Sequence, residues 1–191
     1  MRKLLTIISI ADSTTSAFCY ATGRDLPAPI RALKDANALV LDKQMRLHLQ
    51  SKSIGKFTDV QALMVPAILK GRSVAVISPP SSGKTAGYLI PVVDTARRNY
   101  LQQDSSRRNF NPQFVVVASS ARAVRNVHMM AVELNIGKQL QINCLINSAI
   151  GHRTERLLGE GTHILITTPP ALAHAVKERV CRQFQQRLHY A

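Results

Sequence analysis

The feature that most constrains the fold is the change from an apolar run to a polar turn between residues 73 and 85. Residues 73–77 have the composition of a short buried strand, and a helix is predicted from Ala86 to Val93. A turn between a strand and a helix directs consecutive backbone N–H groups and the positive end of the helix toward one point, where an anion is stabilised. The sequence therefore predicts an α/β fold with a phosphate-binding loop.

The loop matches the phosphate-binding pattern G-x-x-x-x-G-K-[ST] only in part, because Ser78 stands where the first glycine belongs. Pro79 and Pro80 lack N–H groups, but the next five residues keep theirs: Ser81, Ser82, Gly83, Lys84 and Thr85. We expect these five to bind a nucleotide, with Lys84 reaching the β- and γ-phosphates and Thr85 holding Mg²⁺. The alternative is a surface turn rich in proline and serine.

Residues 57–72 resemble the Q motif of DEAD-box RNA helicases, in which Thr and Gln open a short helix before the phosphate loop. Gln61 precedes Lys84 by 23 residues, a spacing similar to that of the family. The resemblance implies that Thr58 and Gln61 contact adenine, whose edge a glutamine amide can match as both donor and acceptor. The alternative for Gln61 is an exposed helix residue. The family also places an aromatic ring upstream, but no aromatic residue lies between Tyr20 and Phe57.

Three further apolar runs suit the strands of a parallel sheet: residues 114–118, 140–146 and 161–167. A helix is predicted from Ala121 to Leu134, and residues 176–188 and the segment around residues 39–49 suggest two more. Arg97-Arg98 and Arg107-Arg108 flank a polar stretch that we interpret as a helix end and an exposed loop. With the resemblance, this order implies a P-loop NTPase fold, a RecA-like parallel sheet with helices on both faces.

The resemblance also implies that RNA lies across the strand ends. The residues at the matching positions are Ser119, Ser120, Arg122, Thr168 and Pro169. Most of the family's Pro-Thr-Arg-Glu-Leu-Ala motif is replaced at residues 119–124, where Arg122 and Arg125 either supply its charge or are solvated helix residues. Pro170 and Ala171 replace the Gly and Arg of a second motif.

The acidic motif D-E-x-D of the family, which binds Mg²⁺ for hydrolysis, does not occur in the sequence. We therefore expect this chain to bind nucleotide without turning it over alone, as a fragment of a larger two-domain protein. Residues 1–25 are predicted to be an N-terminal extension or linker, and 26–191 a RecA-like ATP-binding domain that is incomplete at its C-terminal end. Within the extension, residues 4–10 resemble either a broken signal peptide or a strand.

The charge of the chain favours a polyanionic partner. Lysine and arginine total 25 against 11 acidic residues, which gives a net charge of +14, and 16 of the basic residues are arginine. Trp is absent and aromatic residues make up 5% of the chain, so contact with the phosphate backbone is expected over base stacking. An incidental basic character is the alternative. Cys19, Cys144 and Cys181 are scattered, which favours a reducing compartment, and no segment reaches membrane-spanning length.

These observations predict the ATP-binding N-terminal domain of a DEAD-box-type ATP-dependent RNA helicase, with ATP and Mg²⁺ as cofactors and RNA as partner. Two alternatives remain: a non-hydrolysing RNA-binding scaffold of the helicase-like Tudor-domain type, with room for protein partners, and a small-molecule P-loop kinase. The 83 residues before Lys84 argue against a kinase, because such enzymes usually begin near their loop. A cytoplasmic location is expected, with RNA granules or the nucleus as alternatives.

Overall fold

The structure is a computed structural model that describes residues 5–9, 33–35, 40–102, 112–146 and 161–177. The chain divides into two compact units, Met1–Thr95 and Ala96–Ala191. Each unit is described by itself. Among the described residues, no helix combines the length and the apolar character that crossing a membrane requires.

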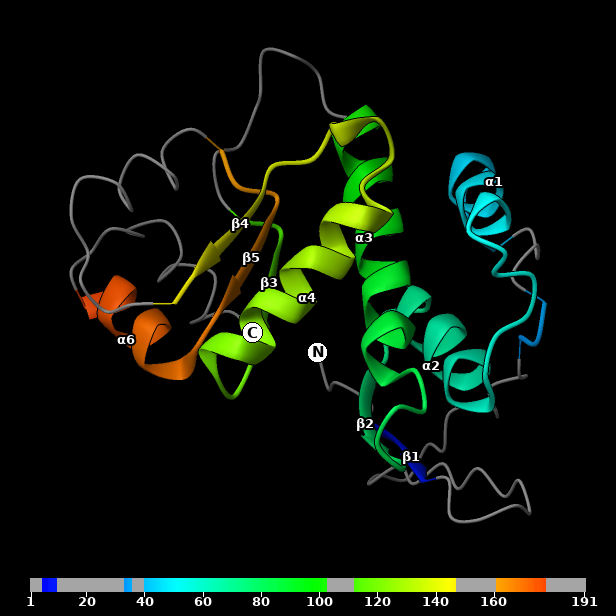
Figure 1. Ribbon diagram of the computed structural model, residues 1–191, viewed down its shortest axis with the longest axis horizontal. Helices are drawn as coiled ribbons and strands as arrows, with labels where there is room; N and C mark the ends of the chain where they lie inside the picture. Colours follow the sequence, from blue (N-terminus) through cyan, green and yellow to red (C-terminus); the bar gives the residue numbers. More distant parts are fainter. Residues whose placement is uncertain (1–4, 10–32, 36–39, 103–111, 147–160, 178–191) are drawn as a thin grey trace. The chain divides into compact units, whose positions relative to one another are not determined.

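The first unit contains two parallel strands and the helices next to them (Figure 1). Its elements are β1 (Leu5–Ser9), α1 (Lys43–Ser51), α2 (Asp59–Leu69), β2 (Ser73–Ile77) and the first half of α3 (Lys84–Gln102). The two strands pair in register from Leu5 opposite Ser73 to Ser9 opposite Ile77. Of the two interpretations of residues 4–10, the structure shows the strand, at Leu5–Ser9. This strand lies within the segment that was expected to be an extension or linker.

Local signals in the sequence explain where α2 begins and ends. Thr58 is the N-cap of a capping box, in which its side chain accepts from the Gln61 N–H and the Gln61 side chain accepts from the Thr58 N–H. At the other end, Gly71 adopts a φ of +69°. Its N–H donates to Ile68 O at 2.8 Å, and the Arg72 N–H donates to Ala67 O at 3.1 Å, which is a Schellman ending. Val60 and Met64 of this helix form a buried cluster, against which pack Leu63 and Ile68 of the same helix, Val74 and Val76 of β2 and Tyr88 of α3.

Asp42 makes two polar contacts that position α1 in the first unit. Asp42 caps α1 by accepting from the Gln44 N–H at 3.0 Å, and the Asp42 N–H donates to the Asp94 carboxylate at 3.1 Å. Asp94 is fully buried, so α1 is tied to α3 by a polar contact inside the core. Burial also raises the pKa of Tyr88 above the usual value for a tyrosine.

The second unit contains a parallel sheet of three strands in the order β3-β5-β4 (Figure 1). Its elements, besides the end of α3, are β3 (Phe114–Val117), α4 (Ala121–Leu134), the short 3₁₀ helix η2 (Ile136–Lys138), β4 (Ile142–Leu145), β5 (Ile164–Thr167) and α6 (Pro169–Lys177). Helix α4 buries one face at helical spacing, with Val124, Val127, Ala131 and Leu134. Leu145, Leu165, Ala171 and Ala175 form a second cluster, against which Val115 packs.

The predicted strands and helices are confirmed where the structure describes them, with two differences. Helix α3 runs beyond the predicted Ala86 to Val93 as far as Gln102, so Asn99 to Gln102 form the helix end of the polar stretch. Arg97 lies within this helix and is only 3% exposed. Residues 178–188 of the predicted terminal helix, together with Arg107 and Arg108, lie outside the described residues.

Candidate nucleotide and nucleic-acid site

The phosphate loop lies between β2 and α3, as predicted, and its shape explains which glycine the chain keeps. Gly83 has a φ of +90° and Ser81 a φ of +61°, whereas Ser78 is not among the residues with positive φ. The left-handed region is costly for a residue with a Cβ. Glycine is required at position 83, where a Cβ would also lie 2.5 Å from Gln61 Nε2, and serine is tolerated at position 78, where φ is not positive.

Lys84 closes onto the loop that precedes it. Its ammonium group donates to the carbonyl of Pro79 at 2.6 Å and to the carbonyl of Ser78 at 2.8 Å. The hydroxyl oxygens of Ser78 and Ser82 lie 3.1 and 3.4 Å from the same nitrogen, and the two hydroxyls are 2.7 Å apart. A positive charge is thus held in the concave turn, where an incoming phosphate would replace neutral oxygens as its partner.

The hydroxyl of Ser78 is a contributor that the sequence did not reveal. The pattern shows Ser78 only as a missing glycine, but in the structure its oxygen links Ser82 and Lys84. The one signal in the sequence was that position 78 lies inside the loop pattern.

The capping box of α2 is also attached to the phosphate loop. Thr58 Oγ1 donates to Ser82 O at 3.0 Å, and Gln61 Nε2 donates to Gly83 O at 3.2 Å. A Cβ built on Gly83 would lie 2.5 Å from Gln61 Nε2 and 3.1 Å from Thr58 Oγ1. The structure therefore brings Thr58 and Gln61, the predicted adenine contacts, together with the predicted phosphate loop. In this structure their side chains contact the backbone of the loop. Gln61 is only 8% exposed, which rules out the alternative of an exposed residue without a partner.

The donor set of the loop fits a polyphosphate. Within the part of the chain that the structure describes, the N–H groups of Ser81, Ser82 and Gly83 donate no backbone hydrogen bond of a turn. The first N–H groups of α3 follow them, and such orphan donors at a helix start favour an anion. Thr85 stands in the first turn of this helix, where its hydroxyl is suited to Mg²⁺. Among the described residues, no three His, Cys, Asp or Glu side chains gather where they could hold a metal ion.

The predicted RNA-contacting residues gather at one edge of the sheet in the second unit. Val117, Thr167 and Leu145 are aligned at the carboxyl ends of the three parallel strands. Ser119 and Ser120 follow β3, Thr168 and Pro169 follow β5, and the Ala118 N–H donates to Thr167 O at 2.8 Å. Four residues that are distant in the sequence therefore share one edge.

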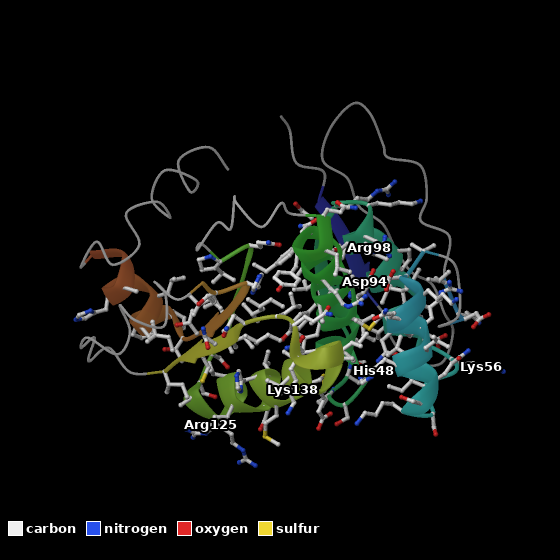
Figure 2. The ribbon with its side chains drawn as sticks, turned by 90° about the horizontal axis from the view of Figure 1, so that it is seen from above. His48, Lys56, Asp94, Arg98, Arg125 and Lys138 are labelled. Carbon is white, nitrogen blue, oxygen red and sulfur yellow. The ribbon has the colours of Figure 1, made fainter. Side chains whose placement is uncertain are left out.

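Helices α4 and α6 both begin at this edge. Ser120 caps α4 by accepting from the Ala123 N–H at 3.2 Å. Thr168, only 8% exposed, donates to Ile146 O at 3.4 Å, and its carbonyl accepts from the Leu172 N–H in the first turn of α6. Arg122 and Arg125 are exposed on α4, and Arg125 is labelled in Figure 2. The N-terminus of α4 and the exposed arginines make this edge suitable for phosphate groups, whereas α6 begins with Pro169 and Pro170, which have no N–H.

Comparison with known proteins agrees with this geometry. The chain is similar to the ATP-dependent RNA helicase DDX4 of Mus musculus, with 24% identity over 171 residues that cover 88% of this chain and 24% of the relative. It is also similar to the ATP-dependent RNA helicase-like protein DB10 of Nicotiana sylvestris, with 26% identity over 174 residues, 88% of this chain and 27% of the relative. The chain thus spans about a quarter of the length of these relatives.

The fold has a solved counterpart in the yeast DEAD-box splicing factor Prp28, with a TM-score of 0.66 and 17% identity over 83% of this chain and 37% of that chain. This likeness supports the predicted α/β, RecA-like fold. The model of the family described as DEAD/DEAH box helicase matches residues 58–189, from the capping threonine of α2 to near the end of the chain. Because that match covers more than half of the sequence, the chain belongs to the DEAD/DEAH box helicase family.

Proposed function

We propose that this chain is the nucleotide-binding N-terminal RecA-like domain of an ATP-dependent RNA helicase, and that it binds ATP with Mg²⁺ in the loop at Ser81 to Thr85. The observation that carries the proposal is the Lys84 ammonium group, which donates to the carbonyls of Ser78 and Pro79 in the turn between β2 and α3. The names of the relatives as RNA helicases support the same function.

Each residue of the loop would have its own role in binding the nucleotide. The N–H groups from Ser81 to Thr85 would bind phosphate oxygens, and Lys84 would exchange its loop carbonyls for the β- and γ-phosphates. Bound Mg²⁺ neutralises charge on the phosphates, and the Thr85 hydroxyl would help to hold it. Thr58 and Gln61 keep the loop in shape from α2.

RNA would bind at the carboxyl edge of the sheet in the second unit. There the N-terminus of α4 offers backbone donors, Ser119 and Ser120 are exposed, and Arg122 adds charge. Such contacts recognise the sugar-phosphate backbone and carry no base sequence. We propose a cytoplasmic place of action, as the scattered cysteines favour.

The test of nucleotide binding is calorimetry with ATP and MgCl₂ on the wild type and on Lys84→Ala. Loss of a charge-assisted contact costs about 1.5–3 kcal/mol, so we expect the affinity of Lys84→Ala to fall at least about tenfold. Lys43→Ala, which removes an exposed lysine at the start of α1, is the matched control and should bind as the wild type does. Equal affinity of wild type and Lys84→Ala would refute the proposed site.

A second candidate function is a helicase-like RNA-binding module without ATP hydrolysis. It is favoured by the loss of most of the family's motif at residues 119–124. Phosphate release in the presence and absence of single-stranded RNA, measured on the longest natural form of the protein, separates the two. Stimulation by RNA supports the helicase, and no release above background supports the module.

A further inference from the structure

We propose that the exposed face of α4 is a docking site for another protein, and that the element it accepts is an acidic amphipathic helix. The site is the outer stripe of α4, formed by Arg125, Met129 and Val132. It lies within the second unit and does not depend on the proposed nucleotide binding.

The outer stripe combines apolar side chains with a positive charge. Its three residues are separated by four and three positions, so they are neighbours on the helix surface, opposite the buried face of α4. Met129 is 63% exposed and Val132 is 42% exposed, so two large apolar side chains lie together in water. Figure 2 shows Arg125 on the outer side of the same helix. A partner that covers the stripe must therefore offer both apolar and anionic groups.

The charge at the start of α4 favours an anionic partner. The first turn has no acidic residue, although the helix dipole favours negative charge there, and both Arg122 and Arg125 lie near this end. The two arginines are three positions apart, so their like charges repel one another. Neither guanidinium has a hydrogen bond or an ion pair within the part of the chain that the structure describes. An acidic side chain of a partner would relieve the repulsion and offset the unfavourable dipole.

The apolar part of the stripe favours a protein over RNA. RNA phosphates would pair with Arg125 but would leave Met129 and Val132 in water, and the stripe has no ring on which a base could stack. An amphipathic helix would cover all three residues, because anchors four and three positions apart are typical of helix recognition. The flexible thioether of Met129 can adjust to the side chains of such a partner.

The test is NMR of the whole chain, labelled at its methionine methyl groups, during titration with a synthetic helical peptide that carries leucine on one face and glutamate beside it. We expect a saturable shift of the Met129 signal and none of Met45 or Met64, which are buried in the first unit. The same peptide with lysine in place of glutamate should bind at least about tenfold more weakly. No shift of Met129 with the glutamate peptide, or equal binding of the two peptides, overturns the proposal.

Single-stranded RNA is titrated in the same way, because it is the other polyanion that Arg125 could bind. Met129 lies two turns along α4 from Arg122, at the edge where we propose that RNA binds, so we expect RNA to leave the Met129 signal in place. A saturable shift of Met129 by RNA would assign the outer stripe to RNA and overturn the proposal.

A charge reversal locates the binding on the stripe. Arg125→Glu should weaken the glutamate peptide at least about tenfold and strengthen the lysine peptide, because like charges would face each other in the first complex and opposite charges in the second. Lys43→Glu, at an exposed lysine of α1, makes the same change in net charge and should alter neither affinity. Equal effects of the two variants would show that binding follows total charge, and would overturn the proposal.

A second variant tests the apolar part of the stripe with the same Met129 signal. Val132→Ser removes apolar surface that the partner would bury, so the glutamate peptide should bind about fivefold more weakly. Because Val132 is exposed, the substitution leaves the core of the second unit intact. Unchanged affinity would reduce the contact to charge alone and overturn the docking of an amphipathic helix.

Discussion

At the scale of single residues, Gly83 is the position where the loop tolerates least change. Its φ of +90° disfavours a side chain, and a Cβ would lie 2.5 Å from Gln61 Nε2. We predict that Gly83→Ala lowers the free energy of unfolding by at least about 1–2 kcal/mol and weakens ATP binding, because Gln61 must leave the loop. Urea unfolding and calorimetry measure the two effects.

Gly55→Ala is the control for this substitution. A Cβ at Gly55 would meet no atom within 4 Å, and its φ is not positive, so the change should be nearly neutral. If Gly83→Ala were as stable as Gly55→Ala and bound ATP equally well, the close packing of loop and capping box would be wrong.

The sequence predicted the identity of the loop residues but not their bonds. Lys84 and Thr85 were found because their spacing from the preceding strand is local, and the capping box of Thr58 and Gln61 spans only three residues. The contact of Gln61 with Gly83 joins positions 22 residues apart and depends on how α2 packs beside the loop. That packing is tertiary, so a pattern along the chain does not contain it.

At the scale of elements, the start of α4 depends on one side chain. Ser120 accepts from the Ala123 N–H and so satisfies an orphan donor of the first turn. We predict that Ser120→Ala lowers the free energy of unfolding by about 1 kcal/mol, as a lost N-cap does. Ser119→Ala, at the exposed position next to it, should change it by less than about 0.5 kcal/mol. Equal effects in urea unfolding would contradict the assignment of the cap.

Element type was predictable from apolar runs, and element length was less so. Residues 114–117 and 164–167 form strands because continuous β-branched runs suit a parallel sheet. Helix α3 extends beyond its apolar segment to Gln102. Its second half is stabilised in the second unit by contacts such as that between the rings of Tyr100 and His163, whose centroids are 5.1 Å apart. Arg97 was expected beside a helix end, but it lies inside α3 and is 3% exposed, because a guanidinium on the inner face of a long helix can be buried when partners are provided.

At the scale of the molecule, the net charge of +14 and the family membership point to the same class of partner. A charge total does not say where the charge acts. The register of the parallel strands brings Ser119, Ser120, Thr168 and Pro169 to one edge, which is where we propose that RNA binds. In the sequence these residues form two groups about 50 positions apart, and only the resemblance to a family joined them.

The location of the charge can be tested by the dependence of RNA affinity on salt. Binding of single-stranded RNA at several KCl concentrations should give a linear plot of log K against log salt, with a slope of about −0.7 for each phosphate neutralised. Arg122 lies in the first turn of α4, at the proposed edge, whereas Lys138 follows the far end of the same helix. We predict that Arg122→Ala makes the slope shallower by about 0.7 and that Lys138→Ala leaves it unchanged. If Lys138→Ala alters the slope and Arg122→Ala does not, RNA binds outside the carboxyl edge, and the hydroxyls and helix N-termini there serve only the fold.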